Sequence, residues 1–204
     1  MRATIAHLPF HDSTIELAHG AGGKASRRLI EGLFLPLLMN PTLAELHDAA
    51  LLATGDGTLA LTTDAFVVRP LRFPGGSIGE LAVNGTINDL AVSGARPLAL
   101  AAAFIVEAGL PSQVLRAEVE ALAAAAARAG VPVVTGDTKV VEHGKADGLY
   151  IVTTALGFVD PRLRLGSGFV QPGDRVLVSG PIGDHGITVL LARGELDLEA
   201  DLVS

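Results

Sequence analysis

Apolar residues along this chain follow two patterns, and each pattern predicts one kind of element. Short apolar runs rich in Val, Leu, Ala and Thr are typical of buried strands, and they predict strands over residues 15–18, 59–68, 98–106, 131–134, 149–157 and 175–179. Segments with apolar side chains at every third or fourth position predict helices over residues 24–39, 78–92, 111–130 and 184–192. Strands separated by helices indicate an α/β (α+β) fold, in which both parallel and antiparallel pairing remain possible.

Proline and glycine predict a domain boundary near residue 160. The stretch Asp160–Gly173 contains two prolines and three glycines, a composition typical of a connecting segment. We therefore predict two domains, over residues 1–160 and 161–204. One strand and one helix cannot enclose a core by themselves, so the second α/β domain is expected to be incomplete in this chain.

Composition excludes several functional classes. The chain has 204 residues and a net charge of −7, and it lacks the Lys/Arg cluster that a nucleic-acid-binding face needs. It contains no cysteine, so neither a disulfide framework nor a thiolate metal site can form. The most apolar run, residues 98–106, is much shorter than the ~20 residues that span a bilayer. We expect a soluble cytoplasmic protein with neither nucleic acid nor a membrane as its partner.

A glycine-rich segment, Gly20–Lys24, precedes the first predicted helix. A phosphate group can approach bare backbone N–H groups at such a position. The segment is not a Walker P-loop, because Ala25 stands where that motif requires Ser or Thr. The alternative is a plain turn between a strand and a helix.

Four aspartates stand in or beside apolar segments, where an unpaired carboxylate is costly to bury. Asp64 and Asp137 are expected at or just past the ends of predicted strands. Asp89 lies within a predicted helix, and Asp48 precedes two alanines. Mg²⁺ prefers a few carboxylates together with phosphate oxygens and water, so all four are candidate metal ligands. Each could instead cap a turn or a helix.

Lys139 follows Asp137 by two residues. A cation at this place could contact a phosphate group or carry a proton. The alternative is a solvated loop charge. The histidines do not show the spacing of zinc ligands, and none of them is assigned as a ligand.

Five motifs, taken in order, resemble the HypE family of hydrogenase maturation factors, which are carbamoyl dehydratases. The motifs are His19–Gly23, Thr62–Gly76, Gly85–Pro97, Gly136–Gly144 and Gly183–Gly186. The resemblance extends from about Ile15 to the last residue.

This resemblance implies a fold, a reaction and partners. The fold would be shared with aminoimidazole ribonucleotide synthetase, selenophosphate synthetase and thiamine-monophosphate kinase. The first domain would bind ATP and dimerise, with its strands pairing into a barrel across a homodimer. The reaction would be ATP-dependent dehydration of a thiocarboxamide on a C-terminal cysteine to a thiocyanate, which supplies cyanide for nickel–iron hydrogenase. The partners would be the carbamoyltransferase HypF and a HypC–HypD complex.

The resemblance also implies roles for individual residues. The ligands of the magnesium ions that bridge the ATP phosphates would be Asp48, Asp64, Asp89 and Asp137. A mobile phosphate lid would consist of Gly20, Gly22, Gly23 and Lys24. Further nucleotide contacts would come from Asn88, Gly136 and Thr138. Lys139 would orient or deprotonate the carboxamide.

The absence of cysteine is a departure from the family. The fragment is therefore expected to be limited to nucleotide binding and dimerisation. A kinase or synthetase relative is the nearest rival. Selenophosphate synthetase would carry a Cys or selenocysteine beside the glycine-rich segment, and thiamine-monophosphate kinase would not be expected to show the run Phe73–Gly76. A non-catalytic module that dimerises and docks partners is the alternative from another class.

Overall fold

The computed structural model describes residues 9–195 and 203–204. The described residues fall into two compact units, which are divided between Ala50 and Leu51. The first unit is helical: a 3₁₀ turn (η1, Leu17–Gly20) is followed by α1 (Lys24–Leu29), a π-helical turn (η2, Ile30–Phe34), α2 (Leu35–Leu38) and a second 3₁₀ turn (η3, Leu43–Glu45). The strand predicted over residues 15–18 is wrong. These residues lie next to a glycine-rich turn, and η1 occupies the second half of the predicted run.

The predicted helix over residues 24–39 is confirmed, with a π-helical turn at its centre. Pro36 explains the irregularity, because proline has no N–H to donate to the carbonyl of Gly32, four residues earlier. That carbonyl instead accepts the N–H of Phe10, at 3.4 Å. The helix thereby holds the segment that precedes it in the sequence.

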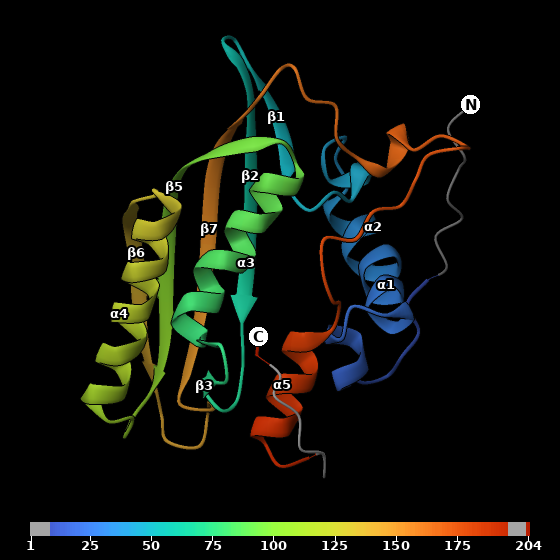
Figure 1. Ribbon diagram of the computed structural model, residues 1–204. Helices are drawn as coiled ribbons and strands as arrows, with labels where there is room; N and C mark the ends of the chain where they lie inside the picture. Colours follow the sequence, from blue (N-terminus) through green and yellow to red (C-terminus); the bar gives the residue numbers. More distant parts are fainter. Residues whose placement is uncertain (1–8, 196–202) are drawn as a thin grey trace. The chain divides into compact units, whose positions relative to one another are not determined.

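The second unit is built on a five-stranded sheet with the order β1-β2-β7-β5-β6 (Figure 1). Its strands are β1 (Ala50–Thr54), β2 (Gly57–Phe66), β5 (Ala95–Glu107), β6 (Val133–Val141) and β7 (Leu149–Val159). The pairs β2–β7 and β5–β7 are antiparallel, and β5–β6 is parallel. Both kinds of pairing therefore occur. The parallel pair is joined by a helix, as a parallel connection requires.

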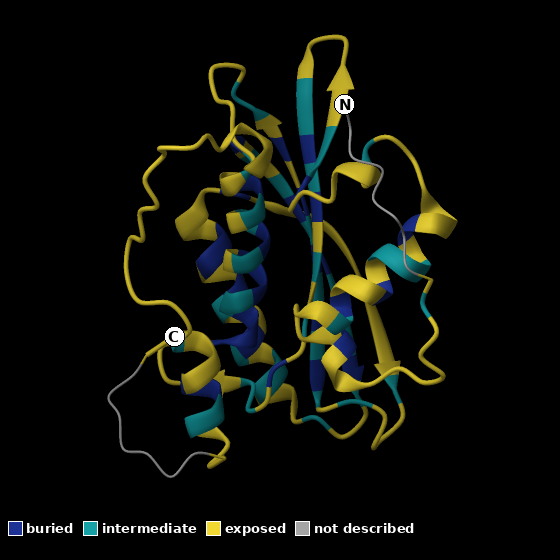
Figure 2. Ribbon diagram, turned by 90° about the vertical axis from the view of Figure 1, so that its right-hand side faces the viewer, coloured by how far each residue is buried: buried dark blue, intermediate teal, exposed yellow. Residues whose placement is uncertain are grey.

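Helices α3 (Ile78–Val92) and α4 (Ser112–Ala129) pack on one face of this sheet (Figure 1), and a two-residue pair, β3 (Arg72–Phe73) and β4 (Gly76–Ser77), precedes α3. Side chains alternate along the strands, so every second residue faces the helices. The core lies between the two layers, where buried positions gather (Figure 2); the residues contributed by the strands include Ala60, Thr62, Leu100, Ala102, Ile151, Thr153 and Ala155.

The region after β7 contains a 3₁₀ turn (η4, Ser167–Phe169) and helix α5 (Asp184–Ala192). Helix α5 confirms the helix predicted over residues 184–192. The strand predicted over residues 175–179 is wrong, and Val176 and Leu177 are 92% and 89% exposed. A β-strand needs a hydrogen-bonded neighbour, and these residues have none among the strands that the structure describes. The domain boundary near residue 160 stays a prediction.

No helix within residues 9–195 and 203–204 is long and apolar enough to cross a membrane. The cytoplasmic location stays a prediction.

Candidate functional site

The glycine-rich segment forms an ordered turn into α1. Gly22 has a φ of +74°, a conformation that glycine adopts without strain. Its N–H donates to the Ser26 hydroxyl (2.9 Å), and that hydroxyl donates to the Ala18 carbonyl (3.4 Å). Gly23 is the N-cap residue of α1. A Cβ atom at Gly20, Gly22 or Gly23 would have no neighbour within 4 Å, so a ligand has room to approach this backbone.

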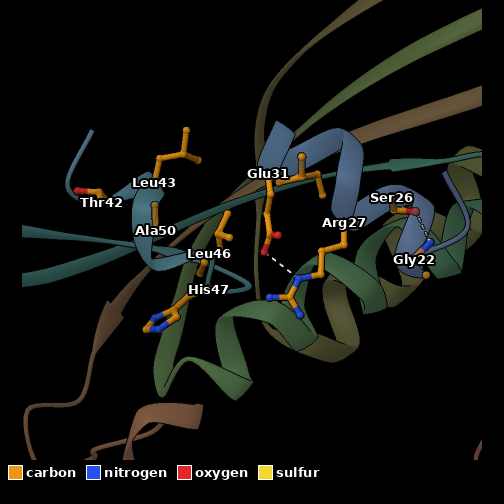
Figure 3. A pocket seen from close by; sticks show the side chains of 12 residues that line it. Gly22, Ser26, Arg27, Glu31, Thr42, Leu43, Leu46, His47 and Ala50 are labelled. Atoms are coloured by element: carbon orange, nitrogen blue, oxygen red, sulfur yellow. Dashed lines mark hydrogen bonds and ion pairs between the residues drawn. The ribbon is translucent and has the colours of Figure 1, made fainter. Parts of the chain in front are cut away.

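A cavity of about 540 Å³ adjoins this turn within the first unit. Figure 3 shows Gly22, Ser26, Arg27 and Glu31 on one side of it, with the Arg27 Nε donating to Glu31 Oε1 at 2.7 Å. The opposite side is formed by residues of the segment 42–50, including Thr42, Leu43, Leu46, His47 and Ala50. Of the predicted phosphate-lid residues, Gly22 and Gly23 line the cavity, whereas Gly20 and Lys24 do not. Asp48 lies in the same segment and is exposed.

Asp64 and Asp89 lie on elements that face each other in the second unit. Asp64 is on β2, and its Oδ2 is 3.8 Å from the place where a Cβ atom of Gly85 on α3 would lie. Asp89 stands one helical turn after Gly85, and it accepts the Thr62 hydroxyl at 2.9 Å. Both aspartates are half-buried, whereas the neighbouring Asn88 is exposed. The two carboxylates thus lie on the same side of the sheet, where β2 and α3 face each other.

Asp137 does not lie at the end of a strand, because β6 is longer than predicted and includes residues 136–139. Pairing with β5 continues through this run. Gly136 lies opposite Ala102 and on the helix side of the sheet, so Asp137 lies on the other face. Its carboxylate is 3.4 Å from the Lys139 Nζ, and both side chains are exposed.

Strand packing by itself explains why residue 136 is a glycine. A Cβ atom there would lie 2.0 Å from the Ala102 carbonyl oxygen, so only glycine lets β6 approach β5 so closely. Thr138 is exposed one strand position beyond Asp137.

The structure therefore brings together only part of the predicted metal site. The row of paired residues Asp64, Thr153, Ala102 and Gly136 crosses the sheet on its helix side, and Asp137 projects from the opposite side. Within the described part of the chain, no three His, Cys, Asp or Glu side chains are grouped so that they could hold a metal ion. Oxygen donors from Asp64 and Asp89 fit Mg²⁺, which binds proteins through one or two carboxylates and takes its other ligands from phosphate and water. The four-aspartate metal site and the catalytic role of Lys139 stay predictions.

Three site residues were not predicted. Thr62 contacts Asp89, Ser26 holds the glycine-rich turn, and Arg27 lines the cavity. A serine at the third residue of a helix after a glycine run is a usable signal, because its hydroxyl can reach the preceding turn. The Thr62–Asp89 contact joins residues 27 apart and carries no comparable local signal.

The most informative relatives are carbamoyl dehydratases. The chain is 52% identical to carbamoyl dehydratase HypE of Azotobacter vinelandii over 200 residues, which are 98% of this chain and 59% of that protein. The chain thus spans about 59% of the length of this relative. The resemblance to HypE predicted from the motifs is confirmed.

Solved structures agree with this similarity. A HypE–HypF complex matches with a TM-score of 0.81 at 47% identity, over 86% of this chain and 57% of that chain. A structure of hydrogenase maturation protein HypE in complex with ATP matches with a TM-score of 0.68 at 47% identity, over 94% of this chain and 57% of that chain.

The fold class is confirmed by a match to a family model, whereas a barrel across a homodimer stays a prediction. The model describes the N-terminal domain of AIR synthase related proteins, and it matches residues 46–159. More than half of the chain is covered, from just before β1 to the end of β7. The chain belongs to the AIR synthase related protein family.

Proposed function

We propose that this chain provides the ATP-binding and dimerisation part of a carbamoyl dehydratase that supplies cyanide for nickel–iron hydrogenase maturation. The observation that carries the proposal is the 52% sequence identity to a protein named carbamoyl dehydratase HypE. A HypE structure in complex with ATP supports the choice of nucleotide. Because the chain spans 59% of that relative, the reaction of the whole protein is part of the proposal.

The proposed reaction removes the elements of water from a thiocarboxamide. The amide oxygen attacks the γ-phosphorus of ATP, and ADP leaves. Loss of both nitrogen protons and breakage of the C–O bond then give the thiocyanate and inorganic phosphate. Phosphoryl transfer depends mainly on positioning and charge neutralisation. This chain has no cysteine, so its own contribution is to hold the nucleotide and not to carry the thiocarboxamide.

Each group of site residues has a part in this proposal. Asp64 and Asp89 would hold magnesium, which supplies charge neutralisation at the phosphates, and Asp48 and Asp137 are the further proposed ligands. Within the glycine-rich turn, where the Gly22 N–H donates to Ser26, the N–H of Gly23 would contact phosphate oxygens. Lys139, on exposed β6, would orient the carboxamide or accept its proton.

The proposed partners are a second copy of the chain, HypF and a HypC–HypD complex, in the cytoplasm. A HypE–HypF complex among the matching structures supports HypF. Exposed apolar side chains on the sheet face opposite α3 and α4, such as Leu156 and Phe158, support a homodimer.

Calorimetry of Mg–ATP binding tests the nucleotide site through Asp89→Asn and Asp64→Asn. The change at Asp89 removes the charge, but the amide oxygen can still accept the Thr62 hydroxyl, so the helix stays anchored. We expect both variants to lose measurable magnesium-dependent binding. Asp56→Asn, in the exposed turn between β1 and β2, is the matched control and should bind as the unchanged chain does. Unaltered affinity in both site variants, with folded circular dichroism spectra, contradicts the proposal.

A further inference from the structure

The His19 ring joins the segment before the glycine-rich turn to the turn itself. Its side chain is 4% exposed. Its Nδ1 lies 3.0 Å from the backbone nitrogen of Glu16 and its Nε2 lies 2.8 Å from Asp12 Oδ2. A backbone N–H can only donate, so Nδ1 is the acceptor and Nε2 carries the hydrogen that is donated to Asp12. The surroundings thus select a single tautomer, and both ring nitrogens are used within the first unit.

Asp12 is held from two sides. Its Oδ2 accepts from His19 and also from Arg28 on α1, at 3.1 Å. Hydrogen bonds from His19 and then from Arg28 lower the pKa of the Asp12 carboxyl, because they stabilise its charged form. The chain Arg28–Asp12–His19–Glu16 therefore ties the segment before the turn to the helix after it.

The same segment has a second anchor beside the ring. The Phe10 ring meets the His19 ring edge-on, with the centroids 5.5 Å apart. The Phe10 N–H donates to the Gly32 carbonyl, which Pro36 leaves without its usual helical donor. His19 is thus enclosed by groups whose own positions are set by the helix.

These contacts hold one end of the glycine-rich turn, and Ser26 holds the other. Between His19 and Ser26 lie Gly20–Gly23, whose glycines have open space on the side where a Cβ would stand. A loop of this composition loses much conformational entropy when it binds a ligand, unless it is already ordered. Fixed ends reduce that loss. The N–H groups of Ala21 and Gly22 already donate to Ala18 and Ser26, so within the turn we expect the N–H of Gly23 to contact the ligand.

We propose that His19 is a positioning residue: it holds the turn Gly20–Gly23 in the conformation that receives the phosphate groups of the nucleotide. This inference rests on the proposed function, because that function identifies the ligand. His19 itself, with both ring nitrogens engaged, does not contact the ligand. This role agrees with the sequence-based interpretation, in which none of the histidines was assigned as a ligand.

Three substitutions at His19 separate its two contacts. His19→Asn keeps an acceptor near the place of Nδ1, His19→Gln keeps a donor near the place of Nε2, and His19→Ala removes both. His11→Ala, an exposed histidine of the same segment, is the matched control. Peptide-level hydrogen–deuterium exchange without nucleotide reports on residues 17–24, and a peptide over residues 40–50 of the same unit is the internal reference.

We expect His19→Ala to speed exchange in residues 17–24 about tenfold or more, with little change in residues 40–50. His19→Asn and His19→Gln should give intermediate rates, because each retains one contact. Mg–ATP affinity should fall in the same order, and saturating Mg–ATP should slow exchange in every variant. Partial recovery by the Asn and Gln variants would show that His19 positions the turn through its two contacts. A general loss of stability would instead also speed exchange in the reference peptide over residues 40–50.

Two results overturn the proposal: exchange in residues 17–24 that is unchanged in all three variants, or an equal effect of His11→Ala. If His19→Ala does not fold, the Asn and Gln variants decide between the same outcomes. If the unchanged chain binds no Mg–ATP, the proposed function fails, whereas the exchange measurement still decides whether His19 orders the turn.

Discussion

At the scale of the residue, Glu107 shows how a carboxylate without a sequence signal can organise a loop. It ends β5, and its side chain, 11% exposed, accepts the N–H groups of Gly144 and Gly148 from the loop between β6 and β7. These two bonds lower the pKa of Glu107, because both stabilise the charged carboxylate. The loop that follows the Asp137–Lys139 strand is thereby closed at both ends by a single side chain.

Glu107→Gln should destabilise the fold at pH 7. The oxygen of the glutamine side chain can accept only one of the N–H groups of Gly144 and Gly148, and its NH₂ group would face the other N–H, which is also a donor. A lowered pKa in the folded state stabilises the fold above the ordinary glutamate value of 4.5, and this contribution is lost as the pH falls through the folded-state pKa. The difference in unfolding temperature between variant and unchanged chain should therefore shrink from pH 7 to pH 3. Glu142→Gln, exposed in the same loop, should show little difference at either pH, and a pH-independent gap for Glu107→Gln would refute this account.

At the scale of the element, α3 takes its N-terminal cap from α4. Ser77, the N-cap residue of α3, makes no side-chain capping bond. The N–H of Gly79 instead donates to Glu118 Oε2 at 3.2 Å, and the Glu118 Oε1 lies 2.8 Å from the Arg72 Nε. The helices approach so closely that a Cβ atom at Gly79 would lie 2.1 Å from the Glu118 carbonyl oxygen. The negative charge of the fully buried Glu118 is thus stabilised by the N-terminal end of α3 and by Arg72.

Gly79→Ala should cost about 1–3 kcal/mol of unfolding free energy, since overpacking against backbone atoms cannot be relieved by a rotamer change. Gly186→Ala is the matched control within α5, where a Cβ atom meets nothing within 4 Å, and alanine there is favoured over glycine by up to about 1 kcal/mol. Urea unfolding measures both. Equal midpoints for the two variants would show that the helices can separate without cost.

At the scale of the whole molecule, the two faces of the sheet differ. One face is covered by α3 and α4, whereas Leu156 and Phe158 on the other face are 37% and 53% exposed. Strand β6 lies at the edge of the sheet, where no described strand pairs with its outer side, and it carries exposed valines, such as Val140 at 70%. Apolar surface and an open strand edge are features that association between copies would cover.

Light scattering should give about twice the chain mass of 20.9 kDa if these surfaces form the proposed homodimer. Phe158→Glu places a charge in the apolar face and should yield a monomer, whereas Val92→Glu, exposed at the end of α3, should leave the dimer intact. A monomeric unchanged chain at all concentrations would rule out the dimer.

Much of the fold follows from local pattern. The periodicity of apolar residues identified the helices α3, α4 and α5 and the strands β2, β5, β6 and β7 of the central sheet, because local side-chain spacing reports directly on the period of an element. Strand β1 was not predicted. The periodicity also failed over residues 15–18 and 175–179. Those runs have the composition of strands, but a strand also requires a partner, which no local pattern supplies.

The sequence by itself determined the family, the order of the main elements and the residues that can supply oxygen ligands or phosphate contacts. Only the tertiary structure decided that Asp64 and Asp89 share a layer while Asp137 projects from the other side of the sheet. It also decided that Gly136 serves strand packing, and that His19 and Glu118 have specific partners. The physical reason is distance along the chain: Thr62 and Asp89 are 27 residues apart and Gly79 and Glu118 are 39 apart. Such contacts are set by strand order and register, which spacing within one element does not encode.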